Sequence, residues 1–322
     1  MTLKKIFLLL ILFVTLIIAG CAEGGNSNRG GGQMEQFRVG SSFVDFTLEP
    51  GSPPVVVYDA NTTPFDIILR VENRGEWDIE PNSFRVLLEG FSDKETWGDE
   101  TQLNFIIANQ LVGYDSLYDI DGDFEYVSFT NLMYQKVLNQ NSFSNPYMIR
   151  SCFPYGTKVA FTACVDNEAR RSLRDGDLRL CDGFSIRDFS VSSGPIGITQ
   201  IEQQVVNERL RLIFTIEHRE FNNEQLTLFS PGSMNEVCRV QEGISQTQVR
   251  NAVQLSLVDS VVGEFSCSGE GKVTFPSGVT QRRVTCETDI STLEQQEVPM
   301  LLNIEYDILK NMMNSVRVER SN

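Results

Sequence analysis

The sequence predicts an all-β protein made of two antiparallel β-sandwich domains in tandem. Apolar side chains recur at every second position in several runs, as expected for strands with one face on a core and the other in water. Turn-forming residues such as Asn73-Arg74-Gly75 and Asp175-Gly176 separate these runs. Many short strands joined by regular turns are typical of β-sandwiches, and 322 residues are enough for two domains.

The chain begins with the pattern of a secretory signal. Lys4 and Lys5 precede an apolar run at residues 6–18, and the small residues Ala19 and Gly20 follow it. As a helix this run would reach about 20 Å, which is short of the roughly 30 Å hydrocarbon core of a bilayer. A cleaved signal peptide is therefore favoured over a retained transmembrane helix.

Cys21 follows Ala19-Gly20 directly, so the segment resembles the lipobox of prokaryotic lipoproteins. In that family the signal peptide is removed before the cysteine, whose sulfur carries a diacylglycerol. The resemblance implies a signal peptide at residues 1–20, a diacylglycerol on Cys21, and a membrane-anchored protein displayed outside the cytoplasm. Two acyl chains give a durable tether. The Gly/Asn/Ser-rich sequence after the cysteine makes residues 21–36 a flexible spacer.

The mature chain is strongly acidic. Loss of Lys4 and Lys5 lowers the basic count from 27 to 25, against 43 acidic residues, for a net charge near −18. Phosphate backbones and anionic lipid headgroups repel such a chain, which excludes nucleic acid as a partner.

The alternating runs define where the two sandwiches lie. The clearest of these runs are at residues 65–72, 84–89, 209–217 and 302–308. We expect one sandwich at residues 37–192 and the other at residues 195–322. The boundary is the small, kinked stretch Ser192-Ser193-Gly194-Pro195, which precedes a new strand at residues 196–206. Residues 131–146 are rich in Asn and Gln and fit either a short helix or a long loop.

Six cysteines remain after Cys21, and an even number in an exported protein indicates disulfides. A zinc site would need close pairs such as C-x-x-C, which the sequence lacks. The alternation places Cys164 and Cys181 on the outer face of two neighbouring strands. We therefore expect a cross-strand bridge between these two residues.

The other four cysteines allow two further bridges. Cys267 and Cys286 share parity with apolar neighbours and point toward a core, which predicts a bond between them. Cys152 and Cys238 are left over, and a bond between them would join the two domains.

Residues 64–79 (PFDIILRVENRGEWDI) combine an alternating strand with an Asn73-x-Gly75 turn. This segment resembles the strand and turn of the Ig-like repeats of bacterial and archaeal surface proteins, including CARDB-type domains, whose turn glycine takes the left-handed conformation. Residues 211–220 repeat the strand without the turn, so the second domain is assigned from its alternation alone. The resemblance implies two Ig-like sandwiches, display at the cell surface, and contacts with proteins or glycans. It names no catalytic residue.

The acidic stretch at residues 115–125 is the sharpest local feature of the chain. Asp119, Asp121, Asp123 and Glu125 alternate, so in a strand their carboxylates would project from one side. Clustered carboxylate oxygens are what Ca²⁺ requires, although the spacing does not match the EF-hand pattern. Because Asp121-Gly122 also suits a hairpin turn, a solvated acidic hairpin is the main expectation and a structural calcium site is the alternative. No other cofactor is expected.

Candidates for catalysis or ligand contact are few. His218 is the only histidine, and the G-x-S-x-G motif of a Ser-His-Asp hydrolase is missing, so we expect a structural residue at a strand end. A single histidine also excludes histidine-rich zinc sites. Trp97 lies in a polar stretch and is the better candidate for an exposed contact with sugars. Asn61-Thr62-Thr63 is a glycosylation sequon in an expected loop.

Together these features predict a lipid-anchored binding or scaffold protein of the cell surface, without catalysis. Its partners would be other envelope proteins or glycans, contacted through loops at the ends of rigid sandwiches. Two alternatives remain open: a surface glycan hydrolase that uses a carboxylate pair, and a structural subunit of an envelope layer.

Overall fold

The structure is a computed structural model. It describes residues 36–37, 43–60, 63–91, 97, 103–165, 185–206, 208–219, 225–234, 238, 250–258, 262–291 and 296–321. Most of these residues lie in β-strands, and the pairing is antiparallel except between β2 and β17, so the predicted all-β class with antiparallel sheets is confirmed. The predicted signal peptide, Cys21, Cys181 and Asn61 lie outside the described residues. Within the described ranges there is no helix of the length and apolarity that crossing a bilayer requires.

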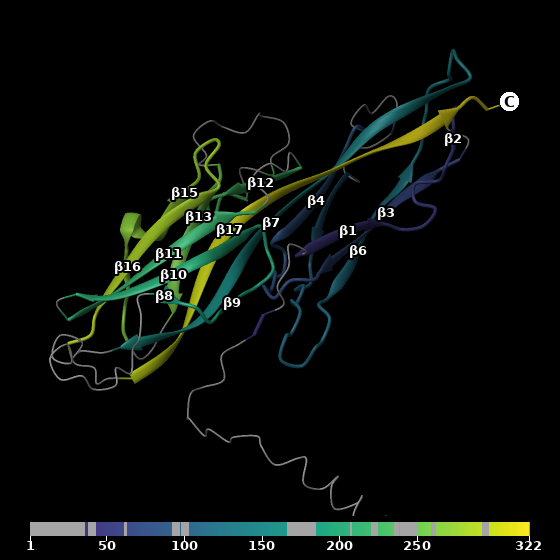
Figure 1. Cartoon of the computed structure of the whole chain (residues 1–322). Helices are drawn as coiled ribbons and strands as arrows, with labels where there is room; N and C mark the ends of the chain where they lie inside the picture. Colours follow the sequence, from purple (N-terminus) through teal and green to yellow (C-terminus); the bar gives the residue numbers. More distant parts are fainter. Residues whose placement is uncertain are drawn as a thin grey trace, which may run out of the picture. The chain divides into compact units, whose positions relative to one another are not determined.

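The described strands form three sheets (Figure 1). The first sheet has the order β1 (Val44–Leu48), β3 (Phe65–Asn73) and β6 (Phe124–Leu132). The second has the order β14 (Ser266–Cys267), β16 (Gln281–Asp289), β11 (Arg209–His218), β10 (Ile196–Val206) and β8 (Ser185–Ile186). The third and largest sheet follows the order β15 (Lys272–Thr274), β13 (Ala252–Val258), β17 (Gln296–Glu319), β7 (Ser142–Val165), β4 (Phe84–Glu89) and β5 (Asn104–Ile107). Three short strands complete it, namely β2 (Val57–Tyr58) and β12 (Leu226–Phe229) on β17 and β9 (Phe189–Val191) on β7.

Two very long strands organise the molecule. β7 and β17 have 24 residues each and pair antiparallel along their whole length, from Ser142 opposite Glu319 to Val165 opposite Gln296. A strand of that length spans about 80 Å. Figure 1 shows the two strands running side by side. Most residues on one face of both strands are apolar and buried, although Ser151 and Thr157 in β7 and Lys310 in β17 interrupt this face.

The shared strands correct the domain boundary predicted at residues 192–195. β7 belongs to the first predicted domain and β17 to the second, yet their hydrogen bonding joins both ranges into one sheet. By its contacts, Met34–Asn322 forms one compact unit. Alternation identifies a strand and its buried face, but it carries no information about which strand pairs with it. The boundary was placed from local composition, which is why it missed this pairing.

Around β7 and β17 the chain forms two lobes, each with a smaller sheet packed on the large one. We define the first lobe as residues 43–153 with residues 308–319, and the second lobe as residues 155–306. In the first lobe Phe46 of β1 meets Phe84 of β4 edge to face at 6.2 Å between ring centroids. In the second lobe Phe161 of β7 meets Phe214 of β11 at 5.7 Å. Each lobe is therefore sandwich-like.

The predicted strand faces agree with the structure where the alternation was clearest. In β3 the alternate residues from Phe65 to Asn73 are buried, and in β11 the alternate residues from Leu210 to His218 are buried. Of the Asn/Gln-rich stretch at residues 131–146, residues 133–141 form a loop and the two ends belong to β6 and β7, so the expected loop is shorter than predicted and no helix is present there. The interpretation of Trp97 was wrong. Its side chain is 5% exposed and packs against Phe91 and Tyr134, because the polarity of a short sequence window does not decide whether an aromatic ring joins the core.

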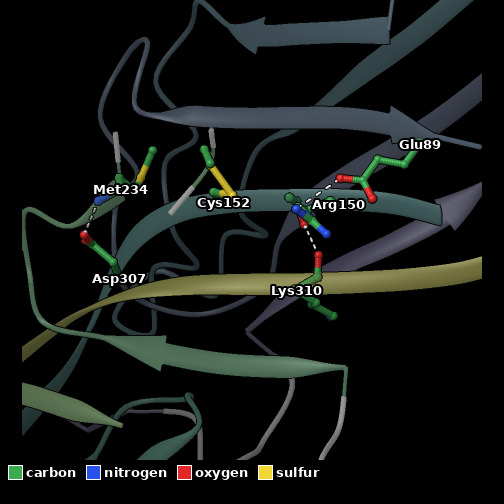
Figure 2. The surroundings of a disulfide bond; sticks show 8 residues. Glu89, Arg150, Cys152, Met234, Asp307 and Lys310 are labelled. Atoms are coloured by element: carbon green, nitrogen blue, oxygen red, sulfur yellow. Dashed lines mark hydrogen bonds and ion pairs between the residues drawn. A yellow bond between two sulfur atoms is a disulfide. The ribbon is translucent and has the colours of Figure 1, made fainter. Parts of the chain in front are cut away.

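Two of the expected disulfides are present among the described residues. Cys152 on β7 is bonded to Cys238, which joins a strand of the first predicted range to a segment of the second (Figure 2). Cys267 on β14 is bonded to Cys286 on the adjacent β16. Cys164 is also disulfide-bonded, and its expected partner Cys181 lies outside the described residues.

Candidate interaction surface

Large apolar side chains gather on the exposed surface of one short segment, the loop between β5 and β6 and the start of β6. Half of the twelve large apolar residues that are exposed among the described residues fall within residues 112–126. They are Val112, Leu117, Tyr118, Ile120, Phe124 and Tyr126. Single exposed apolar residues are ordinary, whereas a gathering of them marks an interaction site. We call residues 112–126 the 112–126 surface.

A tight turn holds the tip of this surface. Asp115 and Ile120 form an antiparallel bridge, with Asp115 N donating to Ile120 O at 3.0 Å. The Asp115 carboxylate accepts hydrogen bonds from the backbone N–H groups of Leu117, at 2.9 Å, and of Tyr118, at 3.1 Å. This is the local side-chain capping for which Asp is favoured in turns. The result is that Leu117 and Tyr118 point away from the protein, with 73% and 71% of their surface exposed.

The base of the surface is fixed to the turn that follows β3. Asn73 N donates to Asp123 O at 2.9 Å, and Gly113 N donates to the Asp78 carboxylate at 2.7 Å. The Asn73 side-chain amide donates to Trp77 O at 2.8 Å and to Leu111 O at 2.9 Å. Gly122 lies so close to this turn that a Cβ would be 1.9 Å from Asn73 O, which restricts the position to glycine. These contacts make the loop a rigid support for its exposed side chains.

The Asn73-x-Gly75 turn therefore has a different role from the one that the sequence suggested. Gly75 is not among the residues with a positive φ angle, so left-handed backbone does not explain it. A Cβ at Gly75 would instead be 1.9 Å from the hydroxyl oxygen of Tyr155, which fills that space. The glycine is needed for close packing against β7, and the asparagine is needed to hold the 112–126 surface.

The four predicted calcium ligands do not share one face of a strand. Asp119 lies in the turn with a φ of 53° and accepts a hydrogen bond from the Tyr114 hydroxyl. Asp123 accepts from Val112 N at 3.2 Å, and Glu125 accepts from the Asn109 side-chain amide at 3.2 Å. Asp121 lies between them on exposed, irregular backbone. Over the part of the chain that the structure describes, no three metal-binding side chains come together closely enough to hold an ion.

The 112–126 surface is strongly negative. It contains five carboxylates, and the sequence has no Lys, Arg or His from residue 95 to residue 135. Two arginines of the neighbouring segment lie close to it. Arg70 lies 4.5 Å from the centroid of the Phe124 ring and pairs with Glu72 at 2.9 Å.

Arg74 also uses its charge on neighbouring carboxylates. It pairs with Glu72 at 3.1 Å and Asp45 at 3.2 Å. The hydrogen bond to Glu72 is the main cause of a pKa of Arg74 above its usual value. Asp121 of the 112–126 surface also attracts Arg74 and contributes to the same shift. Asp45 and Glu72 equal Arg70 and Arg74 in number, so together with the five carboxylates this region carries a net negative charge.

A cluster of polar side chains is buried where the two lobes meet. Glu76, which is 5% exposed, accepts a hydrogen bond from Ser193 N at 2.8 Å. The hydroxyl groups of Thr157 and Tyr306 are 2.8 Å apart, and Thr157 donates to Ile196 O at 3.1 Å. Burial raises the pKa of the Tyr306 hydroxyl well above its usual value. This group ties β7 and β17 to the segment before β10, and its burial leaves no surface for a ligand.

His218, the sole histidine, is a core residue. It is 3% exposed, and its ring meets the ring of Phe275 edge to face at 5.7 Å. This agrees with the expectation of a structural residue at the end of its strand.

The surroundings of the Cys152–Cys238 bond contain a buried carboxylate. Asp307 of β17 is 2% exposed and accepts a hydrogen bond from Met234 N at 2.9 Å (Figure 2). Burial raises the pKa of Asp307 to about 6 in spite of hydrogen bonds from the backbone at residues 232–234. On the same strand as Cys152, Arg150 pairs with Glu89 at 3.1 Å.

A groove of about 480 Å³ opens in the first lobe between the β1–β2 connection and β3. Its lining includes the apolar residues Val56, Phe65 and Ile68. The lining carboxylates are Glu49 and Asp66, and Asp66 already accepts a hydrogen bond from Asn131 N at 3.0 Å. Its volume is within the range of small-ligand sites.

Comparisons with known proteins identify no family. No protein-family model matches the sequence, and no curated protein matches it significantly. Among solved structures, the chain is weakly similar to the serine-rich repeat adhesion glycoprotein Srr1 from Streptococcus agalactiae. The identity is 10%, the alignment covers 87% of this chain and 96% of that chain, and the TM-score is 0.17. A TM-score this low supports no argument about fold or function.

Proposed function

We propose that the protein is a cell-surface binding protein, anchored by a diacylglycerol on Cys21, that contacts its partner through the 112–126 surface. In this proposal the lobes are Ig-like sandwiches that hold the contact loop away from the membrane. The observation that carries the proposal is the exposure of Leu117, Tyr118 and their apolar neighbours on a loop with a fixed base. The extracytoplasmic location is supported by the disulfides, which persist in oxidising environments.

Large apolar side chains are unfavourable on a loop that is exposed to water. Loops exposed to water carry mostly polar residues, and large apolar side chains there are retained when a partner covers them. Tyrosine is enriched at interfaces because its ring is apolar and rigid while its hydroxyl still bonds with water or a partner. A loop held by Asn73 and Gly122 presents these groups without having to be ordered on binding, which favours affinity.

The proposal is tested by in-cell cross-linking, capture of the full chain and identification of what is bound to it. Replacing the two most exposed side chains of the turn, Leu117→Ser with Tyr118→Ser, should abolish most of the capture of the partner. The control is Val137→Ser with Met313→Ser, since these residues are also exposed but lie elsewhere on the first lobe. Both double variants should keep the melting temperature within a few degrees, because exposed residues contribute little to stability. Undiminished capture by the loop variant would contradict the proposal.

The anchor is tested separately. Cys21→Ala should release the protein from the membrane or leave the precursor uncut, because the acyl chains have no other expected site. Normal processing with unchanged membrane retention would refute lipidation without affecting the binding surface.

A second candidate function, hydrolysis of glycans at the cell surface, is favoured only by the groove, whose lining carries Glu49 and Asp66. Retaining and inverting glycosidases both need a pair of carboxylates. The test is release of reducing sugars from surface glycans by the purified protein and by Glu49→Gln. Activity that this substitution abolishes would establish the enzyme.

A further inference from the structure

We infer that the partner of the 112–126 surface is a polypeptide segment in which basic residues are interspersed with apolar ones. This inference rests on the proposed function and adds to it the chemistry of the partner. It follows from the arrangement of charge and apolar area on the described residues.

Among the described residues, the carboxylates of the surface outnumber the cations close to them, although Asp121 attracts Arg74. The carboxylates of Asp115 and Glu125 accept hydrogen bonds from backbone N–H groups and an amide, which are uncharged donors. Such donors orient the carboxylates but carry no positive charge that would offset theirs. The nearby Arg70 and Arg74 pair with Glu72 and Asp45, so the two arginines do not offset the five carboxylates of the surface. A partner with Lys or Arg would therefore gain Coulomb attraction from this excess of negative charge.

The apolar groups lie between these charges and not apart from them. Along the turn, exposed Leu117, Tyr118 and Ile120 alternate with carboxylates on either side. Lys and Arg suit this arrangement because their aliphatic stems pack on apolar groups while their charged ends reach a carboxylate. Their cationic ends also interact favourably with the faces of tyrosine rings. Apolar side chains of the same segment would cover Leu117 and Ile120.

Other partners fit this surface less well. A neutral glycan stacks on open aromatic faces, yet the Arg70 guanidinium already covers a face of Phe124, and Tyr126 meets the ring of Phe124 at 80°. A second copy of the chain would place two negative surfaces against each other in a symmetric contact, which is repulsive. Nucleic acids and anionic lipids are repelled for the same reason.

The inference is tested by selecting peptides from a displayed random 12-residue library on the purified full chain. The peptides that bind the chain, but not its Leu117→Ser/Tyr118→Ser variant, should be rich in Lys or Arg together with apolar residues. The best of these peptides is then synthesised, and its Kd is measured for the chain and its variants. Raising the salt from about 0.1 M to about 0.5 M should weaken it severalfold, because salt screens exposed charges.

The matched charge variants are Asp119→Asn with Asp121→Asn in the loop, and Glu264→Gln with Glu297→Gln in the second lobe. Asn is well tolerated at the left-handed position of residue 119, so the loop variant should fold normally. It should weaken the peptide roughly tenfold, while the second-lobe variant, which changes two exposed acids elsewhere, should leave the Kd unchanged. Equal effects of the two variants would overturn the inference.

The outcomes separate this inference from the proposed function. If peptides selected through the loop are acidic or uncharged, or if the partner captured in cells proves to be a glycan, the loop is a binding surface but the inference is wrong. If neither selection nor capture depends on Leu117 and Tyr118, the proposed function fails as well.

Discussion

The two lobes share β7 and β17 but differ in what they expose and in how they are held together. Of the twelve large apolar side chains that are exposed among the described residues, eleven belong to the first lobe and only Val206 to the second. Both lobes carry ion pairs, and those of the second lobe include Arg211 with Glu287 and Arg283 with Glu202 on its five-stranded sheet, both at 2.7 Å. The second lobe also carries the Cys267–Cys286 bond within its own sheet. In the function that we propose, the first lobe contacts the partner and the second lobe supports it.

The cores differ in a related way. The core of the first lobe contains a network of aromatic contacts, with Phe84 stacked on Phe153 at 4.4 Å between centroids and Trp97 packed against Phe91. The five-stranded sheet of the second lobe buries mostly aliphatic residues, such as Leu210 and Leu212 of β11. Yet one continuous cluster of buried residues includes both sets. This comparison teaches that the lobes have separate surfaces but a common core, and three experiments test it.

The largest effect should come from truncating the core of either lobe. Phe84→Ala in the first lobe and Phe214→Ala in the second each remove a fully buried ring and should lower the free energy of unfolding by about 3–5 kcal/mol. Trp97 lies in the core of the first lobe, whereas Trp77 lies against Gly156 and Lys158 of the second lobe. In a Trp77→Phe background the fluorescence therefore reports the first lobe, whereas far-UV circular dichroism reports both. Because β7 and β17 run through both lobes, Phe214→Ala should shift the fluorescence transition and the dichroism transition in urea together.

Different urea midpoints for the fluorescence and dichroism transitions would contradict a common core. If Phe214→Ala moved the dichroism midpoint and left the fluorescence midpoint unchanged, the lobes would unfold independently, as two tandem domains would.

Removal of a disulfide should cause the second largest loss of stability. Cys152→Ala with Cys238→Ala opens a loop with a sequence separation of 86, and chain entropy predicts a loss of about 4.5 kcal/mol. Cys267→Ala with Cys286→Ala opens a separation of 19, for which about 3 kcal/mol is expected. Urea unfolding of the two double variants without reductant measures both values. A larger loss for the second pair would show that the bond within the second lobe matters more than the one that joins distant segments.

The smallest effect should be the pH dependence that Asp307 introduces. Because burial raises its pKa from 3.8 to about 6, the folded state binds the proton more tightly than the unfolded chain does. The stability that this group contributes is therefore complete below about pH 4 and is lost as the pH rises to about 6. Asp307→Asn should remove this loss of about 1–3 kcal/mol. The free energy of unfolding of the variant, relative to that of the wild type, should therefore increase as the pH rises from about 4 to about 6.

Urea unfolding of both proteins at a series of pH values is the measurement. The difference between the two curves isolates Asp307 from the other acids of the chain. Two parallel curves between pH 4 and pH 7 would contradict the assignment.

Several features of the site could be read from local sequence. Asp115, Asp119 and Asp121 stood out as an acidic stretch, and the absence of cations from residue 95 to residue 135 was visible in the same place. The apolar residues between them were a signal that the calcium hypothesis passed over. A strand face requires extended backbone, whereas Asp119 has a positive φ angle and lies in a turn. Its conformation depends on hydrogen bonds from Tyr114 and from the backbone, which alternation does not encode.

The sequence by itself determined the clearest strands, their buried faces and the pair Cys267–Cys286, because the two-residue period of a strand is a local property. The pair Cys152–Cys238 was expected only because these two cysteines were left over. Only the tertiary structure decided that β7 and β17 pair over 24 residues, that Trp97 is buried, and that Asn73 anchors the 112–126 surface. Each of these depends on residues far apart in the chain, as with Asn73 and Leu111. A contact between distant segments is chosen by competition among all possible pairings, and no window of neighbouring residues contains that information.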